Sequence, residues 1–175
     1  MFQLHDYILF LFLIVAFIID VRSHKIPNWL SAGGMVIGVL YHLISDGIEG
    51  LIFSFLGLLI AGGIFLILYV FKALGAGDVK LFAAIGAIVG VQMVLYMMMY
   101  AIIVAGLIAI IILLFTKTFL RKMTSVFFHI LGSIFSKDFR RLEEFKTTKS
   151  TRFPFMYAVI PAVMLTYYYV YFAYS

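Results

Sequence analysis

The sequence contains no cysteine and little charge. Only 12% of its 175 residues are Asp, Glu, Lys or Arg. Without cysteine the chain cannot form disulfides, thiolate metal sites or a cysteine nucleophile. Soluble domains carry about 25% charged residues, so this chain has too little polar surface to cover a water-soluble globule. Its composition is 65% hydrophobic, which predicts one membrane-embedded domain over residues 1–175.

Long apolar runs predict an all-α, polytopic membrane protein with six transmembrane helices. The first run has no Lys or Arg before it, so we expect it to be retained and not cleaved as a signal peptide. Residues 81–116 carry no charge, and as one helix they would extend about 54 Å against about 30 Å of hydrocarbon. This run should therefore contain two helices with a turn near Gly90. The predicted spans are residues 4–20, 29–44, 51–71, 78–91, 93–115 and 153–174.

Basic residues predict the topology. Most of them lie in residues 117–152, where apolar residues at steps of three and four predict an amphipathic helix at the membrane surface, over about residues 118–146. The others are Arg22, Lys25, Lys72 and Lys80. Six spans place all these loops on one side, which the positive-inside rule makes cytoplasmic. We therefore expect a multi-pass protein of the cytoplasmic membrane, with both termini outside and anionic lipid at the cytoplasmic face.

Small and aromatic residues suggest how the helices pack. Glycine and alanine recur at four-residue spacing, which permits close helix contact in lipid; the pairs are Gly34 with Gly38, Gly57 with Ala61, and Gly86 with Gly90. The end of the last span is rich in tyrosine, which is typical of an aromatic belt at a membrane interface; these residues are Tyr167, Tyr168, Tyr169, Tyr171 and Tyr174.

Two aspartates stand at the edges of apolar runs. Asp20 ends the first span and Asp78 begins the fourth, so both should lie near the cytoplasmic edge of the hydrocarbon. A carboxylate at a helix centre in a bilayer costs about 2.5–3.5 kcal/mol, which makes such acids functional candidates. Two carboxylates about 3 Å apart cannot both ionise easily and share a proton, as in aspartic proteases. One could then activate water while the other polarises a peptide carbonyl, with no metal or organic cofactor.

A simpler interpretation of each aspartate is a helix cap or a boundary residue. Asp78 before Val79 and Lys80 fits a capping role at the start of a helix. The glycines before it, Gly75 and Gly77, permit positive φ and the close approach of another backbone, such as a substrate strand. The spacing by itself leaves capping and catalysis both open.

The two segments resemble motifs of one family. Gly75-Ala76-Gly77-Asp78-Val79-Lys80 resembles the GxGD motif of the type IV prepilin peptidases. The segment from Asp20 to Ile26-Pro27-Asn28 resembles the first-aspartate segment of that family, and Phe153-Pro154-Phe155 loosely resembles the opening of its last span. The pair of motifs, in this order, is more specific than GxGD alone. The resemblance covers nearly the whole chain.

This resemblance implies a membrane aspartic endopeptidase. It would remove the short basic leader of type IV pilin-like precursors, prepilins or preflagellins, after a glycine at the cytoplasmic membrane boundary. Asp20 and Asp78 would be catalytic, and Gly75, Gly77, Lys80, Pro27 and Asn28 would shape the site or contact substrate. Longer relatives carry a four-cysteine region and many methylate the new amino terminus. This chain resembles the short Flp/Tad-type or archaeal preflagellin-type forms, so we assign it no methyltransferase activity.

Other readings stay open at this level. Lys80 could tune Asp78 or simply extend to the interface. The four histidines show no metal-ligand spacing, so we expect no metal site, and we expect no nucleic-acid partner. The expected partner is a precursor with a basic leader and a hydrophobic helix. The alternative functions are a small proton-coupled transporter, which needs further polar residues across the bundle, and a non-catalytic membrane scaffold.

Overall fold

The computed structural model describes residues 3–23, 26–71, 74–115 and 155–173. The chain divides into two units, Met1–Ala105 with Pro154–Ser175, and Gly106–Phe153. The packing described below lies in the first unit. The described residues form helices and no strand, which confirms the all-α prediction. The predicted surface helix over residues 118–146, and residues 153 and 154 of the last predicted span, lie outside the described residues.

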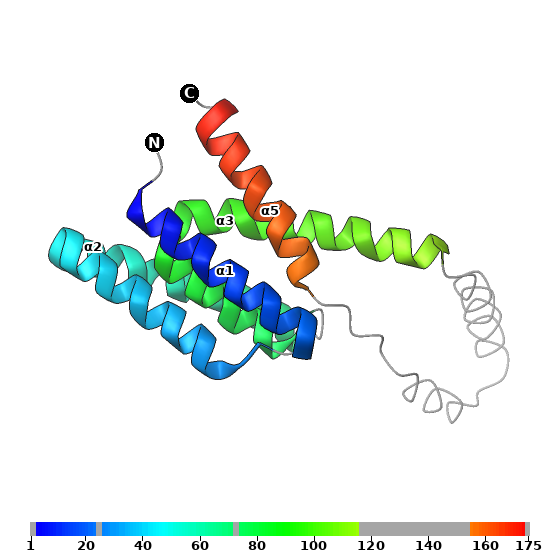
Figure 1. Ribbon diagram of the computed structural model, residues 1–175, viewed down its shortest axis with the longest axis horizontal. Coiled ribbons are helices and arrows are strands. Elements are labelled where there is room, and N and C mark those ends of the chain that lie inside the picture. Colours follow the sequence, from blue (N-terminus) through cyan, green and yellow to red (C-terminus); the bar gives the residue numbers. More distant parts are fainter. Residues whose placement is uncertain (1–2, 24–25, 72–73, 116–154, 174–175) are drawn as a thin grey trace, which may run out of the picture. The chain divides into compact units, whose positions relative to one another are not determined.

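Four helices form the described structure (Figure 1). They are α1 (Leu4–Ser23), α2 (Asn28–Val70), α3 (Ala76–Phe115) and α5 (Met156–Tyr168), and a π-helical turn, Tyr169–Ala173, follows α5. Of these, α1, α2 and α3 are long and apolar enough to cross a membrane, and α5 belongs to a shorter apolar helical segment. The predicted count of six transmembrane helices is therefore not supported. Each of α2 and α3 contains a kink, at Gly47 and at Gly90, where we expected two separate helices.

Glycine marks both of these positions. Inside α2 the chain leaves helical geometry at Gly47 (φ 62°, ψ −135°), and inside α3 it does so at Gly90 (φ 75°, ψ −177°). Side chains rarely adopt positive φ, which glycine tolerates because it has no Cβ. Both residues lie within turns that the sequence predicted. Figure 1 shows both helices bending sharply.

Contacts along α3 show that α2 reverses direction at Gly47. In its first arm, Gly34 lies against Ala84 and Gly38 against Ala87, so the residue numbers rise together. In its second arm the order is opposite: Gly57 lies against Gly86, and Gly62 against Ala83. The two arms of α2 are therefore antiparallel, and both pack on the first arm of α3. The predicted close packing of small residues is confirmed at Gly34, Gly38, Gly57, Ala61 and Gly86.

The first arm of α3 is the centre of the bundle. Residues 81–90 are all buried, as expected of a helix that is apolar on every side. The bend at Gly90 turns the following backbone N–H groups away from the carbonyls of Ala87 and Ile88. Side chains of α2 bind these carbonyls instead: Ser54 Oγ donates to Ala87 O at 2.6 Å, and His42 Nε2 lies 2.8 Å from Ile88 O. These bonds matter because an unsatisfied backbone group in an apolar interior costs several kcal/mol.

Candidate active site

Asp20 lies on the buried face of α1, near its carboxyl end. The buried residues of this helix recur at steps of three and four, so they line one face; they are Asp6, Leu9, Phe12, Leu13, Ala16 and Asp20. Asp20 is 6% exposed. Its Oδ2 accepts a hydrogen bond from the backbone N–H of Met156, at 3.4 Å. Because no side-chain cap bonds the amino end of α5 from its own N-cap residue, Asp20 acts as a cap contributed by another helix.

Asp78 lies in the first turn of α3. Its Oδ2 accepts the backbone N–H of Gly75 at 2.9 Å. The helix begins at Ala76, so this bond is the half of a capping box in which the third helical residue reaches back to the N-cap. The capping interpretation of Asp78 is thus supported. Capping fixes the carboxylate in place and does not compete with a chemical role.

The two aspartates interact. The charge of Asp20 acts on Asp78 by Coulomb interaction, although Asp20 belongs to α1 and Asp78 to α3. Each carboxylate also meets the amino end of a helix, α5 for Asp20 and α3 for Asp78. Helix amino ends carry partial positive charge and favour the ionised form of a nearby acid. This arrangement suits a pair of carboxylates that holds one proton between them.

The loop after α1 runs beside the loop before α3. A Cβ on Gly77 would lie 3.7 Å from the Cβ of Ile26, which is ordinary contact. Further along the same segments, Lys80 Nζ donates to Asn28 Oδ1 at 2.8 Å. Together with the Asp20–Asp78 interaction, these contacts join the segment that follows Asp20 to the segment that contains Asp78. Pro27 is the N-cap residue of α2, and its extended backbone (φ −70°, ψ 145°) separates α1 from α2.

The predicted role of the two glycines needs correction. Among the described residues, positive φ occurs at Gly47 and Gly90, not at Gly75 or Gly77. A Cβ at position 75 would lie 3.2 Å from Asp78 Oδ2, which is tighter than most real contacts. Gly75 therefore leaves room for the Asp78 carboxylate as it folds back on the loop. Gly77 has ordinary space around it, so the structure shows no steric need for glycine there.

One acid of the bundle was missed by sequence reasoning. Asp6 is fully buried, and its carboxylate accepts hydrogen bonds from Tyr167 Oη at 2.5 Å and Tyr171 Oη at 3.2 Å. Tyr167 is 6% exposed, so it belongs to the core and not to an interfacial belt. The signal was the steps of three and four that join Asp6 to Asp20 through Leu9, Leu13 and Ala16.

Comparison with known families gives one match. A model described as the type IV leader peptidase family matches residues 7–114 of the chain. This range includes both aspartates and both loops that meet at the site, and it ends before α5. No curated protein and no solved structure matches the chain.

Proposed function

Because the chain belongs to the type IV leader peptidase family, we propose that it is a membrane aspartic endopeptidase with Asp20 and Asp78 as its catalytic pair. The observation that carries the proposal is the meeting of the two motifs. The carboxylates interact electrostatically, and Lys80 binds Asn28 beside them. Both observations support a site in which acids from different helices act together. The four-residue frame around Asp78 is the GxGD motif of the proposed enzyme class.

The proposed mechanism uses one proton shared by the pair. The ionised carboxylate removes a proton from water, and the water oxygen attacks the carbonyl carbon of the scissile peptide. The protonated carboxyl donates its proton to the carbonyl oxygen, which gives a neutral tetrahedral diol. The first carboxyl then transfers its proton to the leaving nitrogen while the C–N bond breaks. The second carboxylate recovers its proton from a diol hydroxyl as the new carboxyl group forms.

The proposed substrate is a type IV pilin-like precursor, a prepilin or preflagellin. It has a short basic leader, a glycine and then a hydrophobic helix. Glycine before the scissile bond weakens the substrate helix where the peptide must open. Cleavage would occur at the cytoplasmic boundary of the membrane. We assign no methyltransferase activity and no cofactor to this chain.

Asparagine at either aspartate tests the catalytic pair. We expect Asp20→Asn and Asp78→Asn each to abolish cleavage, a loss of roughly a thousandfold or more, because asparagine can neither carry the shared proton nor act as base. The measurement is mass-spectrometric detection of leader release from a peptide with a basic leader, a glycine and an apolar segment. Asp46→Asn, at an acid whose side chain is 65% exposed, is the control. Retained cleavage by either purified mutant with normal folding contradicts the proposal.

The alternative functions give different outcomes in the same experiment. A scaffold tolerates both asparagine substitutions in its assembly role. A proton-coupled transporter needs polar groups that continue across the bundle. Between Asp6 and Asp20, however, the buried residues of α1 are all apolar: Leu9, Phe12, Leu13 and Ala16. The buried face of α1 therefore offers no polar path between its two acids, which argues against a proton relay along this helix.

We also propose that the chain crosses the membrane six times, with both termini outside and the site near the cytoplasmic face. The support is the reversal of α2 at Gly47, which makes its two arms antiparallel, and the bend at Gly90 in α3. With α1 and the segment from α5 onward, these arms give six passes. All Lys and Arg residues then fall in loops on one side.

Single cysteines test this topology directly, because the chain has none of its own. Ser45→Cys, in the exposed turn before Gly47, should react in whole cells with a maleimide that cannot cross membranes. Ser23→Cys, exposed at the end of α1, should react only after the membrane is opened. Labelling of both sites from outside would contradict the six-pass arrangement.

A further inference from the structure

The mechanism uses one end of α1, and Asp6 lies near the other end. Asp6 is fully buried, and the atoms around it are mostly neutral donors. Its carboxylate accepts the backbone N–H of Gln3 at 2.7 Å as well as the hydroxyls of Tyr167 and Tyr171. His5 Nε2 lies 3.4 Å from Asp6 Oδ1. Isolated buried carboxylates are costly, so this set of donors explains how Asp6 is held, but not why an acid is there.

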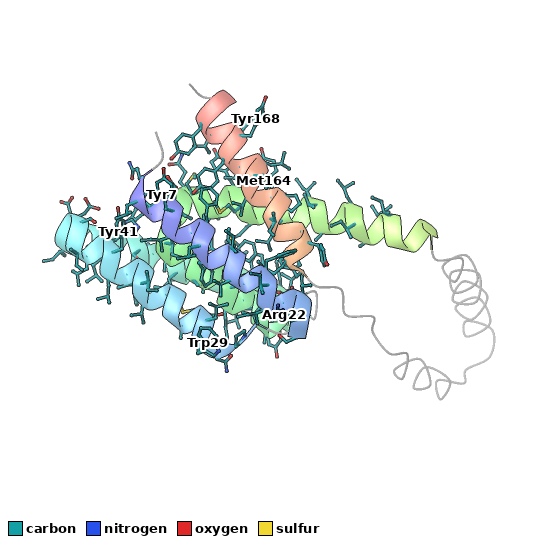
Figure 2. All side chains as sticks on the ribbon, in the orientation of Figure 1. Tyr7, Arg22, Trp29, Tyr41, Met164 and Tyr168 are labelled. Carbon is teal, nitrogen blue, oxygen red and sulfur yellow. The ribbon has the colours of Figure 1, made fainter. Side chains whose placement is uncertain are left out.

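Helix α5 contacts both aspartates of α1. The amino end of α5 donates the Met156 N–H to Asp20, and the opposite end of α5 carries Tyr167. Figure 2 labels Arg22 at the Asp20 end of α1 and Tyr7 at the Asp6 end, and α5 runs between these ends toward Tyr168. The two helices are thus antiparallel, with a polar contact at each end.

The lengths of the two helices fit this double contact. The helical rise from Asp6 to Asp20 is about 21 Å, and that from Met156 to Tyr167 is about 17 Å. The tyrosine side chain, which extends beyond its backbone, covers the remainder. Between the ends, ring contacts keep the same order, with Phe17 and Tyr157 centroids 5.7 Å apart and Phe10 and Tyr167 centroids 5.0 Å apart.

Hydrogen bonds at the Asp6 end can fix the position of α5 along α1, which apolar packing alone does not fix. Apolar contact is non-directional, so the apolar faces of α1 and α5 do not strongly set how far one helix slides along the other. The bonds from Tyr167 and Tyr171 to Asp6 are directional and need a single axial position. That position is the one in which the Met156 N–H reaches Asp20.

We propose that Asp6, Tyr167 and Tyr171 form a positioning clamp that sets α5 along α1, so that the first N–H of α5 meets the catalytic Asp20. The proposal rests on the proposed function of Asp20. The clamp residues act through α5 and do not touch the reacting atoms. The bound N–H and the amino end of α5 favour the ionised form of Asp20. A displaced α5 removes this effect.

Tyrosine hydroxyls are the best groups to remove, because phenylalanine keeps the ring packing. We expect the Tyr167→Phe/Tyr171→Phe double variant to lose roughly tenfold in kcat on the leader peptide with little change in KM, since small misplacements of catalytic groups are costly. The acid limb of its pH–rate profile should move to higher pH, because a carboxylate that loses a donor is protonated more easily. Simple loss of folded protein would lower the rate without moving this limb. Tyr168→Phe, at a tyrosine that is 65% exposed, is the matched control.

A cysteine pair provides a readout that does not depend on activity. Phe17→Cys with Tyr157→Cys places two thiols where the rings now face each other. We expect oxidative cross-linking of this pair to be slower in the double tyrosine variant, and the cross-link, once formed, to restore most of the lost rate.

Two results would overturn the clamp. One is a double variant whose kcat and pH profile match those of Tyr168→Phe. The other is a loss of rate that cross-linking does not restore. If instead Asp20→Asn remains active, the proposed function fails. The rate of cross-linking then tests the clamp separately, because an unchanged rate in the double tyrosine variant shows that the tyrosines do not position α5.

Discussion

The two ends of α1 each hold a buried aspartate, on the same face of the same helix. At one end, Asp6 is surrounded by hydrogen-bond donors, two of them tyrosine hydroxyls from α5 and from the π-helical turn that follows it. At the other end, Asp20 interacts with a second carboxylate, Asp78, and accepts one backbone N–H from α5. The residue type and the burial are alike, and the neighbours differ.

This difference separates a structural acid from a candidate catalytic one. Donors around a carboxylate hold it in a single state. A second carboxylate instead creates a shared proton that can move during a reaction. An aspartate in an apolar bundle is therefore weak evidence for catalysis by itself. The partner that it meets in the folded chain is the stronger evidence.

The largest effect should come from alanine at the two acids, with opposite consequences for stability and activity. Asp6→Ala leaves two tyrosine hydroxyls without this acceptor, which should cost about 2–6 kcal/mol of folding free energy, at about 1–3 kcal/mol for each hydroxyl. Asp20→Ala also removes a like-charge neighbour of Asp78, so its stability should change by about 1 kcal/mol or less, while cleavage is lost. Thermal unfolding in detergent and leader release measure the two effects. Equal loss of stability in both variants would show that Asp6 is no more a structural acid than Asp20.

A second, smaller effect should appear at the turn near the Asp6 end. A Cβ on Gly50 would collide with the backbone carbonyl of His42, so Gly50→Ala should destabilise the protein by about 1–3 kcal/mol through overpacking. Gly63→Ala is the matched control in the same arm of α2, because nothing lies within 4 Å of its added Cβ. Alanine favours helix over glycine, so the control should be neutral or slightly stabilising. Similar melting temperatures for both variants would show that the reversal at Gly47 does not bring Gly50 against His42.

The smallest effect should come from the exposed pair beside the aspartates. Lys80→Met and Asn28→Leu should each reduce cleavage by roughly twofold to fivefold, because their hydrogen bond joins the two loops but faces solvent. The double variant should be no worse than either single variant if the bond is their shared contribution. Arg22→Met, at another exposed basic residue, is the control. Fully additive losses would show that Lys80 and Asn28 act separately.

Much of the fold was predictable because its signals are local. The apolar runs, and the glycines at positions 47 and 90, predicted where helices run and where they bend. The count of six helices is not supported: α2 and α3 each run through a kink, at Gly47 and at Gly90, where we expected separate helices. The pairing of Asp20 with Asp78 stays a prediction, made from the residues around each acid and from their matching depth in the expected topology. Gly75 permits positive φ but does not adopt it, and its N–H binds Asp78.

The sequence by itself determined the helical class, the apolar segments and the two motifs, because these depend on residues that are near one another in the chain. Only the tertiary structure decided which neighbours each acid meets. The bond from Met156 to Asp20 joins residues 136 positions apart, and that from Tyr167 to Asp6 joins residues 161 apart. No local pattern encodes such distances. They follow from the packing of α5 against α1, which brings a tyrosine hydroxyl to one aspartate and a backbone N–H to the other.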